Sequence, residues 1–368
     1  MKNNLFKTKF FQFFLVLLTG FGFGAKASDA GHEAEKKFDI STMIFHHIGD
    51  AHEWHFATLG KTHLSISLPV ILYSADRGLE IFSFGHLKGH EGAHESPVYQ
   101  GYVVDHHGKL VTTDPNRAIF SFLSDPHAPA APNAVKVFNL SITKNIASLF
   151  ISVGLLLGVF FSVAAGYRKR PGAAPSGIQS FFEPIIVFIR DEIAVPNIGK
   201  KHERFLPYLL TVFFFIWFNN LLGLVPGGAN LTGNIAVTFC LAFITLIITV
   251  FSGNKDYWMH ILWTPGIPMW LRPIMLPVEL VGILSKPFSL MVRLFANITA
   301  GHVIILSLLG LTFIFQSVFV GLAATLFSTV MSMLELFVAI LQAYVFTLLS
   351  AMYFGQAVAE HEHHDDHH

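Results

Sequence analysis

The 368-residue sequence contains a single cysteine, Cys240, and few charged residues. One thiol excludes an intramolecular disulfide framework and deprives a cysteine-based metal site of its ligands. Charged residues make up 13% of the chain and hydrophobic residues 52%, whereas soluble proteins average about 25% charged residues. Lysine plus arginine equals aspartate plus glutamate, at 24 each, so no basic excess indicates a nucleic-acid partner. This composition predicts a polytopic membrane protein.

Motifs for chemistry on nucleotides are also missing from the sequence. There is no G-x-x-x-x-G-K-[ST] loop to hold phosphates, and no nucleophile–base pair stands out. Residues 205–254 and 294–334 carry no charged side chain at all. We therefore predict no cofactor and no metal, and we expect the function to reside in the apolar segments.

The N-terminus has the three parts of a secretory signal. Lys2, Lys7 and Lys9 precede an apolar run over residues 10–23, and the small residues of Ala25-Lys26-Ala27 follow it. This order predicts a signal peptide at residues 1–27. The alternative is a permanent first span, for which the apolar run is short.

Residues 28–135 are polar, rich in histidine, and interrupted by glycine and proline. Apolar residues alternate from Leu64 to Leu68, and two short β-type runs flank a turn within residues 99–113, which is typical of strands. We predict a small exported β-containing domain that ends in a proline-rich linker. The histidines between His46 and His107 fit no tight ligand spacing, so solvated or hydrogen-bonded histidines are the preferred interpretation.

The remaining sequence, residues 136–358, predicts a membrane channel domain. Residues 145–167 are long enough to span a bilayer, and Arg168-Lys169-Arg170 follows at once. By the positive-inside rule this end is cytoplasmic, which makes the N-terminal domain periplasmic. Residues 176–195 mix apolar and charged positions, which favours an amphipathic helix on the membrane surface.

Further spans are expected at about 206–225 and 233–252, over a long stretch that reaches about residue 315, and at about 321–354. Five spans from an exported N-terminus place the acidic, histidine-rich tail, residues 359–368, in the cytoplasm. The expected fold is thus an all-α polytopic membrane protein with a small β-containing domain at its N-terminus.

Arg293 is the most unusual residue of these apolar segments. An arginine at the centre of a span costs about 2.5–3.5 kcal/mol on insertion scales, so it marks a candidate functional site. The alternative is that its long side chain reaches the membrane interface. Ser289, Arg293 and Asn297 follow one another at intervals of four residues and therefore share one stripe of a helix.

Three further polar residues lie in uncharged surroundings: His302, Glu335 and Gln342. A histidine and a glutamate in contact can pass protons near neutral pH, because burial and pairing tune both pKa values. The alternative is a structural hydrogen bond between helices. With Arg293 as a fixed charge, we predict two aqueous half-paths for protons, driven by a membrane potential worth about 2.3 kcal/mol per charge per 100 mV.

Two segments resemble subunit a of the F-type ATP synthase: SKPFSLMVRLFANITAGH, residues 285–302, and LELFVAILQAYVFTLLSAMYF, residues 334–354. The resemblance covers roughly residues 140–358. It implies a non-catalytic, proton-translocating subunit whose Arg293 faces the essential carboxylate of the rotating c-ring. It also implies that Glu279 lies near the cytoplasmic half-channel, that Gln342 lies beside the arginine, and that Ser289 and Asn297 occupy family positions.

The resemblance further implies a place in the cell inner membrane and several partners. These are the c-ring, subunit b of the peripheral stalk, the other ATP synthase subunits, and lipid along two long, tilted helices. Many bacterial members have glutamate at the position of His302 and histidine at that of Glu335, so the pair is exchanged here. Gly223 stands where some members carry an acid. A secondary ion-coupled transporter is the alternative, although the Arg293 motif has no internal repeat.

Overall fold

The computed structural model describes residues 49–359 except 60–61, 88–96, 106–109, 115, 121–134, 170–171, 173, 226–227, 263–267 and 269–271. The predicted signal peptide, most of the proline-rich linker and the tail beyond residue 359 lie outside the described residues. The chain forms two compact units. The first comprises Met1–Ser148, Leu222–Ala229 and Gly310–Gly321, and the second comprises Leu149–Leu221, Asn230–Leu309 and Leu322–His368.

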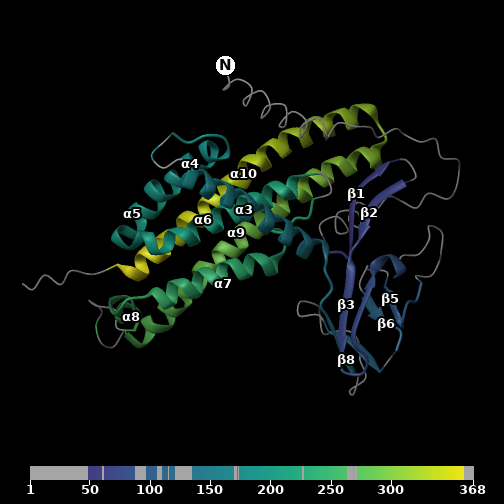
Figure 1. The fold of residues 1–368 in the computed structure, drawn as a ribbon, viewed down its shortest axis with the longest axis horizontal. Helices are drawn as coiled ribbons and strands as arrows, with labels where there is room; N and C mark the ends of the chain where they lie inside the picture. The colour runs from purple at the N-terminus through teal and green to yellow at the C-terminus, as the bar shows by residue number, and fades with distance from the viewer. Residues whose placement is uncertain are drawn as a thin grey trace, which may run out of the picture. The chain divides into compact units, whose positions relative to one another are not determined.

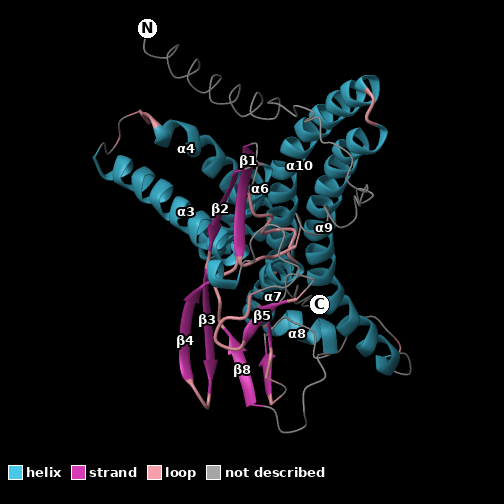
Figure 2. Cartoon of the chain, turned by 90° about the vertical axis from the view of Figure 1, so that its right-hand side faces the viewer, coloured by secondary structure: helices cyan, strands magenta, loops and turns pink. Residues whose placement is uncertain are grey.

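Short strands and one 3-10 helix make up the described N-terminal part of the first unit (Figure 2). They are β1 (Glu53–Leu59), β2 (Thr62–Ser67), β3 (Pro69–Ser74), β4 (Gly78–Ser83), η2 (Phe84–Leu87), β5 (Tyr102–Val104), β6 (Leu110–Thr112), β7 (Arg117–Phe120) and β8 (Val135–Asn139). A four-stranded sheet has the order β4-β3-β8-β7, while β1-β2 and β5-β6 form antiparallel pairs. Strand β3 runs antiparallel to β4 and β8, and β7 runs parallel to β8.

Buried and exposed side chains alternate along the strands, because successive side chains of a strand point to opposite faces of the sheet. The buried side chains form the core. Val70 and Leu72 of β3 are fully buried and cluster with Phe82, Tyr102 and Val137. The pair β5-β6 confirms the two strands predicted within residues 99–113. Strand β8 carries the sheet on to Asn139, beyond the boundary at residue 135 that the sequence led us to expect.

Helices account for nearly all of the rest of the described chain (Figure 1). They are α3 (Lys144–Lys169), α4 (Ile178–Phe188), the π-helix η3 (Ile189–Ala194), α5 (Val195–Ile198), the 3-10 helix η4 (Gly199–Lys201), α6 (His202–Leu224), α7 (Ile235–Ser252), α8 (Lys255–Leu262), α9 (Arg272–Phe315) and α10 (Val318–Val358). Five helical segments within the described residues are long and apolar enough to span a membrane: 144–169, 178–224, 235–252, 274–315 and 318–358. The predicted all-α polytopic fold with a β-containing N-terminal region is confirmed.

The predicted amphipathic helix corresponds to α4 and η3. The structure joins these elements through α5 and η4 to α6, so that helical backbone continues from Ile178 to Leu224. That run is 47 residues long, more than twice the roughly 20 residues that a span needs. The placement of α4 along the membrane surface stays a prediction.

Helices α9 and α10 are unusually long, at 44 and 41 residues. At a rise of about 1.5 Å per residue each covers about 60 Å, twice the roughly 30 Å of a hydrocarbon core. Upright helices of this length would project far beyond the bilayer, so the predicted tilt is consistent with their dimensions.

Phenylalanine rings fill the core of the helical unit, which accounts for part of the chain's 38 phenylalanines. Phe214 of α6 makes edge contacts with Phe160 and Phe182, and Phe205 stacks on Phe354 at 4.9 Å between ring centroids. The Phe205–Phe354 contact holds the beginning of α6 against the end of α10. There Gly355 has no room for a Cβ, because the backbone carbonyl of Asn197 occupies that place.

The C-terminus of α10 is capped by another segment. Asn254 donates its backbone N–H to the carbonyl of Ala357 at 2.9 Å, and its side-chain amide to the carbonyl of Val358 at 3.0 Å. The last carbonyls of a helix have no partner within the helix. Asn254 supplies partners from outside and thereby fixes the end of α10.

Candidate functional site

Three polar pairs connect α9 with α10 across their antiparallel contact. His302 Nε2 lies 3.6 Å from Glu335 Oε1. Asn297 donates to Gln342 Oε1 at 2.9 Å, and Lys286 Nζ donates to Gln356 Oε1 at 2.8 Å. From pair to pair, the residue number on α9 decreases as the residue number on α10 increases. The three pairs therefore connect two antiparallel helices. The structure thereby brings together four of the predicted site residues in two contacts.

The pair of His302 and Glu335 lies inside the helical unit. Glu335 is buried, and neither of its carboxylate oxygens accepts a hydrogen bond from another described residue. A buried carboxylate without hydrogen bonds is costly unless it is protonated or faces a cation. His302 is the titratable group beside it, and proton exchange with this imidazole is one way to relieve that cost.

A glycine makes the room that Glu335 occupies. A Cβ on Gly301 of α9 would lie 2.8 Å from Glu335 Oε1 and 3.0 Å from Cδ. Real Cβ atoms do not approach that closely, so any larger residue would displace the carboxylate. Gly301 therefore positions Glu335 next to His302, its own neighbour in the chain.

Arg293 stands between the Lys286 and Asn297 pairs and is exposed at the surface of the unit. It makes no hydrogen bond or ion pair with any other residue that the structure describes. Ser289, one turn earlier on α9, is likewise exposed. A guanidinium keeps its charge at every physiological pH, so Arg293 on a candidate span is available to an anionic partner outside this chain.

Glu279 lies on the same stripe of α9 as Arg293. Glu279, Lys286 and Arg293 follow at intervals of seven residues, and a helix drifts only about 20° per seven residues. Burial raises the pKa of the Tyr257 hydroxyl on α8, and the nearby Glu279 carboxylate raises it further. Glu279 is therefore close to α8 and away from the His302–Glu335 pair.

Sequence reasoning missed Lys286 and its partners. Besides its hydrogen bond to Gln356, the Lys286 ammonium lies over the ring of Tyr353, 5.4 Å from the centroid. The interval of seven residues on either side of Lys286 was a signal for a shared face. The identity of its partners on α10 was not visible, because it depends on the register of the two helices.

A buried polar link near Glu335 was also missed. Thr232 donates to Asn220 Oδ1 at 2.7 Å, and Asn220 donates to the carbonyl of Ala339 at 3.1 Å. Ala339 is one helical turn beyond Glu335. Adjacent asparagines, Asn219 and Asn220, in an otherwise apolar helix were the signal that the sequence offered.

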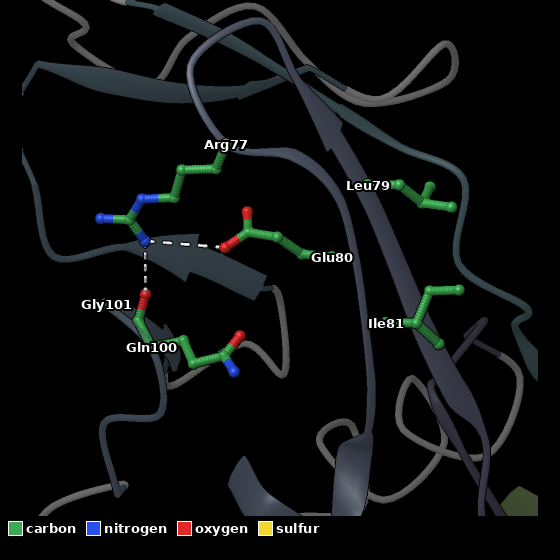
Figure 3. Close-up of a pocket in the computed structure, with 6 residues that line it drawn as sticks. All are labelled: Arg77, Leu79, Glu80, Ile81, Gln100 and Gly101. Carbon is green, nitrogen blue, oxygen red and sulfur yellow. Dashed lines mark hydrogen bonds and ion pairs between the residues drawn. The ribbon is translucent and has the colours of Figure 1, made fainter.

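A surface cavity of about 590 Å³ in the N-terminal unit is lined by Arg77, Leu79, Glu80, Ile81, Gln100 and Gly101 (Figure 3). Arg77 Nη1 donates to the carbonyl of Gln100 at 3.0 Å and lies 3.6 Å from Glu80 Oε1. The charged groups that line the cavity therefore pair with each other. We assign no ligand to this cavity.

Behind the cavity, Arg117 is buried within a polar network. It donates to Ser74 Oγ at 2.9 Å and lies 3.2 Å from Asp76, while Tyr102 donates to Glu80 at 2.6 Å. Burial and Glu80 raise the pKa of the Tyr102 hydroxyl to about 12, and a hydrogen bond from Ser74 contributes most to the lowered pKa of Asp76. This network is a structural tie. In the part of the chain that the structure describes, no three His, Cys, Asp or Glu side chains gather as a metal site.

Comparison with known proteins identifies the helical region. A family model described as ATP synthase A chain matches residues 146–355, more than half of the chain. This chain belongs to the F-type ATP synthase subunit a family.

Individual relatives agree with that assignment. Over 261 residues the chain is 45% identical to "ATP synthase subunit a 2" of Chlorobaculum tepidum, covering 68% of this chain and 73% of the relative. It is 44% identical over 236 residues to "ATP synthase subunit a" of Myxococcus xanthus, covering 62% of this chain and 77% of the relative. The alternative of a secondary transporter has no support among these relatives. Residues 43–133 match a domain family of unknown function, DUF8433.

Proposed function

We propose that this chain forms the proton channel of the ATP synthase Fo sector and supplies the stator arginine that faces the c-ring. Because the chain belongs to the subunit a family, it is a multi-pass membrane protein that works with the other ATP synthase subunits in proton transport and ATP synthesis. One observation supports the proposed role of the stator arginine. Arg293 is an exposed cation on a candidate span, without a hydrogen bond or ion pair among the described residues.

The role of Arg293 follows from its permanent charge. In a medium of low dielectric constant it attracts a deprotonated carboxylate strongly, and it has little attraction for a protonated one. A ring carboxylate that has released its proton is held opposite Arg293, and one that has taken up a proton can move away into lipid. Arg293 thereby separates two half-channels, because a carboxylate exchanges protons on either side of it but not across it.

His302 and Glu335 form the relay of one half-channel. Two titratable groups 3.6 Å apart can hand on a proton directly or through a single water. The buried link of Asn220 and Thr232 ends one turn from Glu335, and its amide and hydroxyl groups are suitable partners for ordered water. Gly223 adds no acid here, so Glu335 is the carboxylate on which this half-channel depends.

Asn297 and Gln342 hold the two helices in register next to Arg293. Gln342 is buried, and its carbonyl oxygen accepts a hydrogen bond from the Asn297 amide. Glu279 and Ser289 belong to the other half-channel, on the side of Arg293 away from His302. Protons leave the ring carboxylate along this side, past the Glu279 carboxylate.

The orientation in the membrane is part of the same proposal. The end of α3 carries Arg168 and Lys169, which favours a cytoplasmic location for that end. The N-terminal unit is then periplasmic after removal of the signal peptide, and the C-terminus is cytoplasmic. The protein resides in the cell inner membrane, where the c-ring and subunit b of the peripheral stalk are its neighbours.

The decisive experiment replaces the arginine. Arg293→Ala is expected to abolish ATP synthesis coupled to proton flow in inverted membrane vesicles, because the ring carboxylate loses its fixed counter-charge. Arg293→Lys keeps a charge but not the delocalised guanidinium, and is expected to restore only a small part of the rate. Quantification of the c-ring and the other subunits in purified complexes controls for assembly. Near-normal synthesis by Arg293→Ala would overturn the mechanism.

A further inference from the structure

The four-stranded sheet of the N-terminal unit has two apolar faces, and only one of them is the core. Leu79 and Ile81 of β4, Tyr73 of β3, Phe138 of β8 and the adjoining Leu140 are between 43% and 61% exposed. Figure 3 shows Leu79 and Ile81 projecting from β4 on the side opposite to Glu80. We call these five residues the outer face.

Strand register places the members of the outer face next to one another. Tyr73 is paired with Leu79 on one side and with Phe138 on the other. Ile81 is paired with Ile71, whose carbonyl accepts a hydrogen bond from Leu140. Contiguous exposed apolar surface of this kind marks an interaction site on a folded protein.

The outer face is joined directly to the start of a membrane span. Leu140 precedes Lys144, the first residue of α3, by four residues, which reach at most about 14 Å. Hydrogen bonds fix this junction: Ile142 N–H to the Pro69 carbonyl at 3.2 Å, and Lys144 N–H to the Ala51 carbonyl at 2.8 Å. The sheet is therefore held to the beginning of α3 by its own backbone.

The charge on the outer face fits a lipid surface. Lys136 is exposed and, two residues before Phe138, lies on the same side of β8. The described residues that point outward on β3, β4 and β8 include no aspartate or glutamate. Tyrosine and lysine flanking aliphatic side chains are the combination that settles at a membrane interface, where lysine meets anionic headgroups.

We propose that the outer face lies against the lipid bilayer at the end of α3 where the chain enters the membrane. The span that follows the sheet in the chain has the exposed apolar side chain of Ile146 in its first turn. The N-terminal unit thus rests on the membrane surface, and it contacts the lipid through its outer face. This inference rests on the membrane span and not on the proton mechanism, so either can fail without the other.

Spin labels on the complete ATP synthase complex test the proposal. Cys240→Ser in a complex without other cysteines allows single labels at Ile81→Cys and Leu79→Cys, with Asn116→Cys, an exposed residue outside the outer face, as the control. The complex is reconstituted in vesicles of equal parts phosphatidylethanolamine and phosphatidylglycerol. Collision rates with oxygen, which concentrates in lipid, and with a water-soluble nickel chelate are then measured.

We expect positions 79 and 81 to collide readily with oxygen and rarely with nickel, and position 116 to show the reverse. Frequent collisions with nickel at 79 and 81 would mean that water covers the outer face, which overturns the proposal. Rare collisions with both would mean that protein covers it, whether another subunit, a second copy or another part of this chain, and would overturn it equally. Proton pumping by each labelled complex shows that the substitutions leave the protein folded.

Discussion

Two groups of charged residues in this protein differ in how far other residues of the chain pair with them. In the N-terminal unit Arg117 donates to Ser74 and lies within 3.5 Å of the carboxylates of Asp76 and Glu80, so its charge is paired within the chain. Between α9 and α10, by contrast, the Glu335 oxygens accept no hydrogen bond from the described residues, and Arg293 has neither a hydrogen bond nor an ion pair there.

This difference in pairing distinguishes charged residues that stabilise the fold from charged residues that can take part in a function. A buried charge that is paired with opposite charges inside the chain favours one arrangement of the side chains around it. A charged group without such partners in its own chain is stable only where a proton, a water molecule or a neighbouring subunit interacts with it. The comparison therefore indicates that Arg117 stabilises the fold, and it is consistent with the roles that we propose for Arg293 and Glu335.

The largest expected effect comes from the relay pair. Glu335→Gln is expected to reduce proton conduction through the complex far more than it reduces assembly, because a neutral amide cannot exchange protons. The double change His302→Glu with Glu335→His restores one acid and one base in contact, and should conduct better than either single change. Proton flux in reconstituted vesicles measures this. A double variant no better than the poorer single one would show that the two residues do not act as a pair.

Arg117→Ala should instead damage only the N-terminal unit. Removing the cation leaves the partly buried Glu80 carboxylate without its compensating charge, which destabilises the sheet around it. Amide hydrogen exchange across β3, β4 and β8 in the intact complex is expected to accelerate, while proton flux per assembled complex stays within twofold. Arg117→Lys, which keeps the charge, is the matched control. Lost proton flux with unchanged exchange would reverse the assignment.

A smaller effect is expected where Gly301 makes room for Glu335. Gly301→Ala forces the Glu335 carboxylate aside, which should slow proton conduction measurably because the carboxylate moves relative to His302. Gly282→Ala on the same helix is the control, since a Cβ there has nothing within 4 Å. Equal conduction by the two variants would mean that the position of Glu335 is unimportant.

The smallest effect concerns pH and the N-terminal unit. Burial lowers the pKa of His52, and the nearby Asp50 carboxylate opposes this only in part. Because the folded pKa lies below the unfolded value of about 6.5, the contribution of neutral His52 is complete above that pH and is lost as the pH falls through the folded pKa.

Hydrogen exchange around His52 should therefore quicken modestly below pH about 6.5. His52→Leu keeps an apolar contact for the stacked Phe84 ring and should remove this dependence. An unchanged pH profile in His52→Leu would assign the effect to another group.

The sequence predicted more of the helices than of the sheet. A span is recognised from local composition, because about 20 apolar residues suffice to cross a bilayer whatever lies next to them. The strands within residues 99–113 were predicted from alternation in the same local way. Strand β8 was not, because the preceding prolines indicated a linker, and β8 is stabilised by pairing with β3, more than sixty residues away.

The site residues divide along the same line. Arg293, His302, Glu335 and Gln342 stand out in the sequence because each is polar in an apolar stretch, which is a property of the sequence alone. Only the tertiary structure decided which residues are in contact: Gln356 with Lys286, Glu335 with Gly301, and Ala339 with Asn220. Those contacts depend on the register of helices distant in sequence, and register is set by the packing of whole faces, which no single segment encodes.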